Sequence, residues 1–443
     1  MELTLVIFFL VYLAMGLGSL PFFRVGRTGA AVIGGMAMLT IGSITPRQAW
    51  NAIDYSTMGM LFGLMVVSAA FVVSGFYGWL ASKAASSNVS ERALLAILIV
   101  VGGVMAAFLT NDVVAVSMCP LLLSITLARG LNPVPFLLGF CFAANTGAAG
   151  TIIGSPQNII AAQKLNLSFA GMSAITAIPA LMSLPVIWLV ITFLYRNQWK
   201  LAAPAGSGED AGQAPAPPPF SLGETLKAAF TAIIVVFAFI FSDWPRETVA
   251  LTAAGFLLLS RRISSKSLLH EVDGELILLI MGLFIVNAGL AATGLPQHLV
   301  TDLAAEGIDL NSPPILFLIS SVVSDLVGNN PAVMMLVPYL HSEGDANYLG
   351  AALSLGTHFS SNLVVFGSLA GIIMVEQAKG RGVRISATEF SKAGALVTGA
   401  TMIIAIIWLM IWMGRTAFTA PPASTGTPFP FDGVQHPRQD HRR

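Results

Sequence analysis

The passage Leu109-Thr110-Asn111-Asp112 precedes an apolar stretch that ends at Pro120, and it has a counterpart at Val327-Gly328-Asn329-Asn330, before a stretch that ends at Pro338. Both passages are polar and helix-breaking, yet each lies in a segment apolar enough for a bilayer. Non-helical backbone at membrane depth is tolerated only where protein or a water-filled cavity satisfies its polar groups. A duplicated pair of such breaks therefore indicates a binding site at a repeat interface, which is the architecture of a secondary transporter.

Further residue matches extend this duplication over most of each half of the chain. An offset of 219 positions relates six pairs: Arg27/Arg246, Leu39/Leu258, Asp54/Asp273, Gly63/Gly282, Leu64/Leu283 and Gly75/Gly294. The offset is 218 at the Asn-bearing passages, and it is 213 at Gly154/Gly367, Ser155/Ser368, Ile159/Ile372 and Ile160/Ile373. Matches in the same order over both halves indicate an internal repeat.

Composition places the chain among polytopic membrane proteins. Hydrophobic residues make up 55% of the 443 residues and charged residues only 10%, with a mean hydropathy of +0.79. A soluble protein of this length would need more charge to cover its surface. The net charge of zero and the absence of a basic patch argue against nucleic acid as a partner. Cys119 and Cys141 lie in apolar segments and indicate neither a disulfide framework nor a metal site.

Apolar length predicts five spans and one hairpin in each half, and so an all-α fold. The first span, 3–23, has no positively charged leader region or cleavage site, so we read it as a retained span with the N-terminus outside. The hairpins are too short and interrupted for ordinary spanning pairs, and we interpret them as re-entrant. The predicted spans are 3–23, 27–44, 54–81, 133–163, 168–195, 225–242, 247–260, 275–300, 347–378 and 393–414, and the hairpins are 94–128 and 314–340.

Basic residues support this topology. With the N-terminus outside, four basic residues precede the distal tail on the outer side: Arg47, Lys164, Arg246 and Arg415. Fifteen lie on the cytoplasmic side: Arg24, Arg27, Lys83, Arg92, Arg129, Arg196, Lys200, Lys227, Arg261, Arg262, Lys266, Lys379, Arg381, Arg384 and Lys392. This is a strong positive-inside bias. Five spans per half also invert the second repeat relative to the first.

The chain then divides into two repeats, a linker and a tail. Residues 1–196 form the N-terminal repeat, with scaffold spans in 1–93 and a transport part in 94–196. Residues 224–415 form the inverted repeat, with a scaffold in 224–312 and a transport part in 313–415. Residues 197–223 are rich in Pro, Ala and Gly and predict a flexible cytoplasmic linker. The tail, 416–443, is expected to be disordered and to lie outside.

Each half contains two predicted helix breaks, one at the hairpin tip and one inside the next span. The second kind covers Asn145-Thr146-Gly147 to Gly154-Ser155-Pro156, and His358 to Ser361-Asn362 and Gly367-Ser368. Asp112, Asn330, Ser155 and Ser368 are predicted to cap the helices that restart. Four helix N-termini would then direct N–H groups and positive dipole ends toward the membrane midplane, forming a site for an anion or a polar oxygen.

A single break of this kind is more often only a cap or a kink satisfied by its neighbours. Four breaks in register between two repeats favour a binding site instead. By contrast, the pattern Gly59-Met60-Leu61-Phe62-Gly63 is explained by helix packing alone.

Three ionisable residues are predicted inside the membrane. Asp112, at the first tip, is a candidate Na⁺ ligand or proton carrier, although it could act only as a cap. Asp325 lies one turn before the second tip and matches Ala107, so it is a second coupling-ion candidate outside the symmetric core or part of a polar wall. His358 matches Asn145 and is either a substrate ligand or a hydrogen-bonding replacement.

These motifs resemble the ArsB/NhaD-type permeases of the ion transporter superfamily, which includes arsenite permease-like and citrate transporter-like proteins. The resemblance rests on the two tips, on Ile152-Ile153-Gly154-Ser155-Pro156-Gln157-Asn158, and on Phe366-Gly367-Ser368-Leu369-Ala370, and it covers 1–414. It implies an elevator-type transporter in a homodimer. It also implies two half-sites: Thr110, Asn111 and Asp112 with Asn145, Gly154 and Ser155, and Gly328, Asn329 and Asn330 with Ser361, Asn362, Gly367 and Ser368. Thr146 and His358, in the broken spans, are further candidate binding residues on the evidence of the sequence pattern alone.

The tips depart from the Ser-Asn-Thr that dicarboxylate carriers of the superfamily have at both tips. Asp112 would repel a multiply charged organic anion unless a coupled cation offset it. Two cysteines cannot supply a three-thiolate arsenic site, so arsenite would bind through its hydroxyl groups.

Three functions remain open at this stage. The first is a secondary permease for a small anion or oxyacid in the plasma or inner membrane, coupled to H⁺ or Na⁺ and without a cofactor. The second is a Na⁺/H⁺ antiporter that depends on Asp112. The third is a membrane-embedded enzyme or receptor, but no catalytic or phosphate-binding motif is present. Without a Walker motif, direct ATP drive would require a partner ATPase subunit, which the sequence does not imply.

Overall fold

Apolar helices make up the described part of the chain. The computed structural model describes residues 2–20, 22–87, 89–200, 218–341 and 345–419. Within these ranges no strand forms, and the only extended pairing consists of two isolated bridges. The all-α prediction is therefore confirmed for the described residues.

The first half forms ten α-helices and one 3-10 turn within the described ranges. They are α1 (Glu2–Leu17), α2 (Arg27–Thr40), α3 (Pro46–Ala52), α4 (Tyr55–Val73), α5 (Phe76–Ser86), α6 (Glu91–Phe108), α7 (Asn111–Ala128), α8 (Pro133–Ala148), η1 (Ile152–Gly154), α9 (Pro156–Lys164) and α10 (Phe169–Leu194).

The second half repeats this order in its described part. It forms α11 (Leu222–Phe241), α12 (Arg246–Leu258), α13 (Ser265–His270), α14 (Gly274–Ala291), α15 (Leu295–Ala305), α16 (Pro313–Val327), α17 (Asn329–Leu336), η2 (Val337–Tyr339), α18 (Ala346–Ser360), η3 (Val365–Gly367), α19 (Leu369–Gly380) and α20 (Ala387–Thr419). The helix that corresponds to α7 ends at Leu336 and passes into the turn η2 at Pro338, whereas the corresponding Pro120 lies inside α7.

Helix packing also recurs between the halves. Helix α6 packs on α8 as α16 packs on α18, and α2 packs on α14 as α4 packs on α12. The α4–α12 and α2–α14 contacts lie at Gly63 and Gly282, two glycines that the 219-residue offset relates. A Cβ atom at Gly63 would lie 2.5 Å from the carbonyl carbon of Ala250, and one at Gly282 would lie 2.6 Å from that of Ala31. Glycine therefore allows both close helix crossings, and the packing interpretation of Gly63 is confirmed for contact within the chain.

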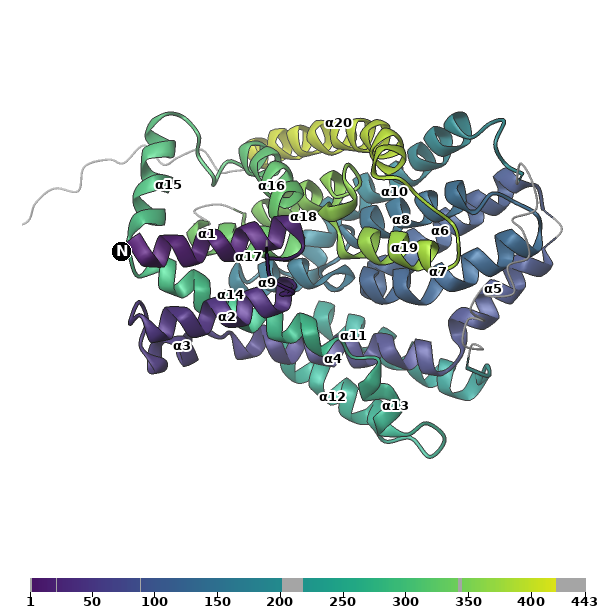
Figure 1. Ribbon diagram of the computed structural model, residues 1–443, viewed down its shortest axis with the longest axis horizontal. Coiled ribbons are helices and arrows are strands. Elements are labelled where there is room, and N and C mark those ends of the chain that lie inside the picture. Colours follow the sequence, from purple (N-terminus) through teal and green to yellow (C-terminus); the bar gives the residue numbers. More distant parts are fainter. Residues whose placement is uncertain (1, 21, 88, 201–217, 342–344, 420–443) are drawn as a thin grey trace, which may run out of the picture.

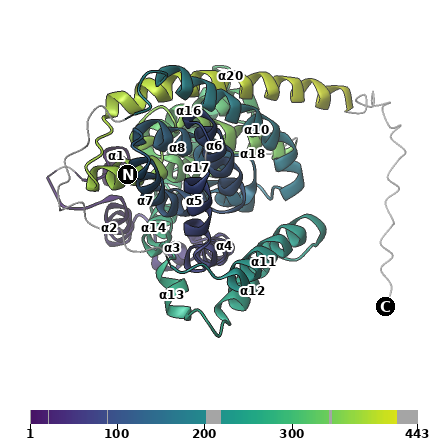
Figure 2. The ribbon, with the colours of Figure 1, turned by 90° about the vertical axis from the view of Figure 1, so that its right-hand side faces the viewer.

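Two groups of helices are visible from both directions. Helices α2, α3, α4, α11, α12, α13 and α14 gather on one side of the molecule, and we call them the lower group (Figures 1 and 2). Helices α6, α7, α8, α10, α16, α18, α19 and α20 lie on the other side and form the upper group (Figures 1 and 2). In Figure 1, α9 and α17 lie near the centre of the molecule.

Seven described helices are long and apolar enough to cross a membrane: α4, α6, α7, α10, α11, α14 and the part of α20 up to Gly414. Three shorter apolar helices, α1, α8 and α16, accompany them. Many large apolar side chains on these helices are exposed, for example Phe9, Phe237 and Ile403 at 66%, 62% and 59%. An apolar exterior of this kind suits lipid rather than water, so the chain is a multi-pass membrane protein.

Several predicted boundaries are wrong. The predicted spans 54–81 and 275–300 each form two helices, because the chain turns at Gly75 and Gly294, whose φ angles are +74° and +75°. Positive φ is costly for other residues, so glycine fits both turns. The first helix ends at Leu17 rather than at residue 23. Helix α20 continues to Thr419, so residues 416–419 are helical rather than disordered. Most of the predicted linker, 201–217, and the rest of the tail, 420–443, lie outside the described residues.

Candidate functional site

An open cavity of about 820 Å³ lies where the two hairpin tips meet the lower group. It contains six of the residues predicted from the sequence: Asn111, Asp112, Gly328, Asn329, Asn330 and Gly367. Both hairpin tips, and the break at Gly367 in the second half, therefore line the same cavity. Its volume lies within the range of pockets that take small-molecule ligands.

The first tip forms because the chain leaves the helix for two residues. Leu109, with φ −122° and ψ 142°, is extended, and α7 then starts at Asn111 with Thr110 as its N-cap. At the second tip Gly328 has φ +91°, a conformation that favours glycine, and α17 starts at Asn329. Both helices thus begin with the asparagine of the tip.

The predicted caps at the two tips are wrong for this reason. Each helix begins before the residue expected to cap it, so Asp112 and Asn330 lie inside the first turn. Thr110 and Gly328 stand at the cap positions; the Thr110 side chain makes no capping bond, and Gly328 has no side chain to make one. The Asp112 carboxylate and the Asn330 amide are consequently left to face the cavity.

The caps predicted at the other two breaks are confirmed. The Ser155 hydroxyl accepts a hydrogen bond from the Asn158 N–H at 3.4 Å and opens α9. The Ser368 hydroxyl accepts from the Gly371 N–H at 3.0 Å and opens α19. Both serines are buried, so their side chains satisfy N–H groups that water does not reach.

A buried polar network joins the two broken spans beneath the cavity. The Asn145 Nδ2 donates to Asn362 Oδ1 and to Ser368 Oγ, each at 3.1 Å. The Asn362 Nδ2 donates to Thr146 Oγ1, also at 3.1 Å. All four side chains are at most 3% exposed. The network therefore links α8 to the segment that follows α18 and to the start of α19 without lining the cavity.

Asn111 connects this network to the cavity. Its Nδ2 lies 3.5 Å from Asn145 Oδ1, and its Oδ1 has no partner although the residue is only 2% exposed. Buried amide oxygens normally accept a hydrogen bond. Asn111 lines the cavity, and its buried, unpaired oxygen is a polar group that still lacks a partner there.

His358 is a hydrogen-bonding residue in this structure. Its Nδ1 lies 2.8 Å from the Ser354 carbonyl oxygen, and its Nε2 lies 2.9 Å from Ser155 Oγ and 3.0 Å from Gln157 Nε2. The side chain is fully buried and does not line the cavity. The role of hydrogen-bonding replacement for Asn145 therefore fits these contacts.

The remaining predicted residues lie behind the cavity wall. Ser361 is buried and donates to the His358 carbonyl oxygen at 2.7 Å, while Gly154 is buried in η1. Asp325 lies on α16, one turn before the second tip, and its Oδ1 has no hydrogen-bond partner. A Cβ atom at Gly367 would lie 3.2 Å from that oxygen. Asp325 therefore stands close to the second break but outside the set that lines the cavity.

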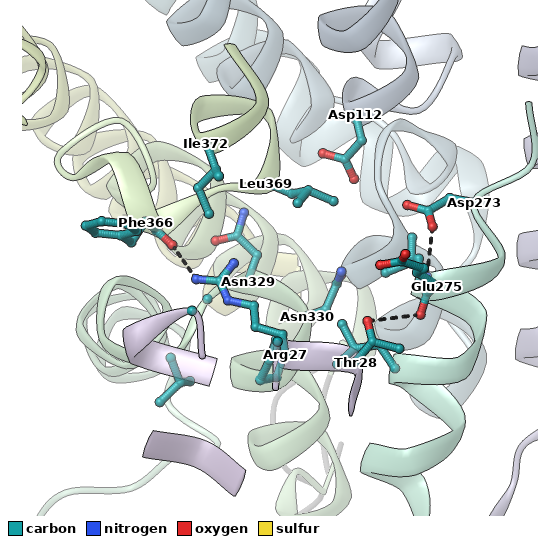
Figure 3. A pocket seen from close by; sticks show the side chains of 18 of the residues that line it. Arg27, Thr28, Asp112, Asp273, Glu275, Asn329, Asn330, Phe366, Leu369 and Ile372 are labelled. Atoms are coloured by element: carbon teal, nitrogen blue, oxygen red, sulfur yellow. Dashed lines mark hydrogen bonds between the residues drawn. The ribbon is translucent and has the colours of Figure 1, made fainter. Parts of the chain in front are cut away.

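Charged residues of the lower group complete the cavity, and sequence reasoning did not place them there. From the lower group, Asp273 and Glu275 line it at the start of α14, and Arg27 and Thr28 at the start of α2. Glu376 joins them from α19 of the upper group. Two of these, Arg27 and Asp273, belong to the pairs at the 219-residue offset. This match was the sequence feature that could have marked them as site residues. Figure 3 shows the Asp112 and Asp273 carboxylates near each other on separate helices.

The electrostatic character of the cavity is acidic. Four carboxyl groups line it: Asp112, Asp273, Glu275 and Glu376. Arg27, the one arginine among the described residues that line it, donates from Nε to the Met15 carbonyl at 2.8 Å and from Nη2 to the Phe366 carbonyl at 3.3 Å (Figure 3). Two backbone carbonyls therefore already accept hydrogen bonds from the Arg27 guanidinium. With four carboxyl groups against this one cation, the lining favours cations over free anions.

A smaller cavity of about 270 Å³ adjoins this site. It shares Asp112, Asp273 and Leu276 with the larger cavity and adds Thr110 and Ser117. Asp112 therefore lines both the larger and the smaller cavity.

Comparisons with known proteins agree on a transporter. The chain is 27% identical over 416 residues to the uncharacterized transporter Mb2703 of Mycobacterium bovis, covering 88% of this chain and 94% of that protein. It is 33% identical over 151 residues to the silicon efflux transporter LSI3 of Oryza sativa subsp. japonica, covering 34% of this chain and 31% of that protein. The fold matches the Alcanivorax borkumensis YdaH transporter with a TM-score of 0.59 and 13% identity, over 94% of this chain and 98% of that one.

A family model described as citrate transporter matches residues 10–356, which is most of the chain and includes both hairpin tips. The relatives and the structural neighbour are transporters, so the chain is not an enzyme. The resemblance to the ion transporter superfamily is thereby confirmed, and the chain belongs to the citrate transporter family of membrane transporters.

Proposed function

We propose that this protein is a secondary transporter of a small anion or oxyacid, coupled to H⁺ or Na⁺, in the plasma or inner membrane. The observation that carries the proposal is the convergence of both hairpin tips on one cavity. Asn111 and Asn329 offer amide groups to a polar solute there, and α7 and α17 direct their N-termini at the same space.

The acidic lining defines the form of the solute that binds. Four carboxyl groups oppose a free multiply charged anion, whereas a neutral oxyacid, or an anion accompanied by a proton or Na⁺, avoids that repulsion. Asp112 is suited to the coupling ion because it faces both cavities and is not required as a cap. The silicon efflux activity in the name of LSI3 is compatible with an oxyacid substrate.

The transport step we propose is a movement of the upper group against the lower group. The matched helix order and the matched packing pairs support two repeats, and five spans per repeat would invert the second relative to the first. The lower group would be the scaffold and the centre of a homodimer, while the upper group, with α9 and α17, would carry the site across the membrane. By the positive-inside bias, both termini lie outside and the cavity opens to the cytoplasm.

A Na⁺/H⁺ antiporter is the second candidate. The same observation on Asp112 favours it, because a carboxylate that faces a cavity without a capping role can exchange cations directly. In that case no solute would accompany the exchange.

Flux into proteoliposomes tests both functions. Purified protein is reconstituted with imposed Na⁺ or pH gradients and an internal pH dye, and it is offered arsenite, phosphate, sulfate, silicate and citrate. We expect gradient-dependent movement of at least one solute, and loss of that movement in Asn329→Ala. Cation exchange that proceeds equally with and without every solute would refute the permease and establish the antiporter.

A further inference from the structure

We infer that an ion pair between Asp54 and Lys164 holds one face of the protein shut, and that the opposite face lacks an equivalent pair. This one-sided ionic latch would favour the conformer seen here over its counterpart. The inference rests on the proposed movement of the upper group against the lower group.

The latch joins an element of each part. Lys164 ends α9 and its Nζ lies 3.0 Å from Oδ2 of Asp54, the residue before α4. The other Asp54 oxygen accepts from the Thr57 N–H at 3.1 Å, which holds the carboxylate in place. The two side chains are 39% and 17% exposed, so the pair is partly shielded from water. The Lys164 ammonium also lies 5.5 Å from the centre of the Phe284 ring.

Neighbouring contacts close the same face. The Gln163 Nε2 lies 3.5 Å from Glu247 Oε2 and 3.5 Å from the sulfur of Met60. The Arg246 guanidinium donates to the Leu167 carbonyl just beyond α9. Met60 is completely buried by this closure. Helix α9 is thus held to α4 and α12 by several side chains, among which the Asp54–Lys164 pair is the only ion pair between α9 and the lower group in the described ranges.

The corresponding positions on the opposite face are apart. Asp273 corresponds to Asp54 and caps α14 through the Leu276 N–H at 2.9 Å, but it lines the open cavity and forms no ion pair with any described residue. Leu279, the counterpart of Met60, also lines the cavity. Residues of α14 and α19 line the open cavity, whereas the corresponding helices α4 and α9 pack against each other.

The partner that Asp273 would meet is neutral. With the 213-residue offset that relates α9 to α19, Lys164 corresponds to Gln377. The Gln377 Oε1 is buried without a hydrogen-bond partner in this conformer. Closing the cavity face would therefore bring an amide, not an ammonium, toward Asp273. Because charge-assisted hydrogen bonds are stronger than neutral ones, the two closed faces differ in stability.

The asymmetry predicts a shift in the conformer ratio when the latch is broken. A partly exposed ion pair changes such a ratio by roughly two- to fivefold. Met60→Cys is the reporter, since it is buried here and exposed only when this face opens. Cys119 and Cys141, both fully buried, are first replaced by Ala. The protein is placed in nanodiscs, so that an impermeant maleimide reaches both faces, and the labelling rate of Met60→Cys is measured.

We expect Lys164→Gln and Asp54→Asn each to raise the labelling rate roughly two- to fivefold. Asparagine retains the capping ability of Asp54, so this variant removes the charge and not the cap. Gln377→Lys, which supplies the missing cation on the other face, should raise the rate as well. Lys227→Gln is the matched control and should leave the rate unchanged, because Lys227 donates to the carbonyls of Leu257 and Leu259 within the lower group.

Two negative results have different meanings. If Met60→Cys is labelled slowly in the parent protein and equally slowly in Lys164→Gln and Asp54→Asn, the latch is wrong and the proposed transport stands. If Met60→Cys is never labelled, even in the presence of solutes and gradients that drive flux, the proposed movement is wrong and the latch with it.

Discussion

Asn111 and Asn145 are neighbouring buried asparagines for which the structure predicts opposite consequences of the same substitution. Asn145 donates two hydrogen bonds of 3.1 Å and lies off the cavity, whereas Asn111 makes one contact at 3.5 Å and lines the cavity with a free oxygen. Asn145→Ala should therefore mainly destabilise the fold, and Asn111→Ala should mainly impair transport.

The expected magnitudes follow from the contacts. Asn145→Ala removes two buried hydrogen bonds worth about 1 kcal/mol each and leaves the Asn362 oxygen without its donor, so the free energy of unfolding should fall by about 2–4 kcal/mol. Asn111→Ala loses only a long contact, so we expect a loss below about 1 kcal/mol. A lost hydrogen bond to the solute would raise the KM for flux by up to about tenfold.

Unfolding in mixed detergent micelles, followed by tryptophan fluorescence, measures the first quantity, and proteoliposome flux measures the second. The two variants serve as controls for each other. Equal stability losses, or a larger loss in Asn111→Ala, would refute the division between a supporting network and a cavity wall. Normal flux kinetics in Asn111→Ala would refute its contact with the solute.

Two other predictions concern single positions. Asp112→Asn should change the Na⁺ or pH dependence of flux while altering the free energy of unfolding by less than about 0.5 kcal/mol, because Asp112 makes no capping bond; unchanged cation dependence would exclude Asp112 from coupling. Gly63→Ala and Gly282→Ala should each destabilise by about 1–3 kcal/mol, since the added methyl groups meet the backbone of Ala250 and Ala31. Gly255→Ala, which meets nothing within 4 Å, is their control and should be neutral or stabilising; losses no larger than that of the control would contradict the close helix crossings.

Local sequence chemistry predicted the features that depend on short stretches of chain. The Asn-bearing tips, the caps at Ser155 and Ser368, and the close packing at Gly63 each depend on a few neighbouring residues whose preferences are strong. The caps predicted at Asp112 and Asn330 were wrong because Leu109, which is extended, and Gly328, which has a positive φ, end the preceding helices, and the next helix then begins at the asparagine. Apolar length alone could not reveal the turns at Gly75 and Gly294, since both flanking helices are apolar.

The cavity itself depends on contacts that local patterns do not encode. Asp273 and Glu376 are separated by about a hundred positions and lie on helices of different groups, yet both line one space. Only the packing of the second half of the chain against the first brings them to Asp112. Equally, Asn145 and Asn362 bond to each other although the sequence assigned them to separate half-sites. The matches between the two halves of the sequence indicate which residues correspond, but they do not indicate that the face with Asp273 is open while the face with Asp54 is closed.

The acid groups of the cavity lead to a last prediction, on the charge of the transported species. At an effective dielectric constant of about 20, two like charges about 8 Å apart repel by roughly 2 kcal/mol. The affinity for a trianion beside several ionised carboxylates would therefore be many powers of ten lower than without them, unless cations or protons accompany the trianion. The family description names citrate, while the cavity holds Asp112, Asp273, Glu275 and Glu376 with only Arg27 opposing them.

If the protein moves a multiply charged solute, the initial rate of flux at subsaturating solute should rise with Na⁺ or with falling pH, because each bound cation cancels part of this repulsion. A neutral oxyacid should show a much weaker dependence. Measuring rates across cation concentration for citrate and for a neutral solute, at constant membrane potential, separates these cases. Citrate flux that is rapid and independent of both H⁺ and Na⁺ would mean that the carboxyl groups are neutral or distant when the solute binds, and the acidic cavity would then not be the site of transport.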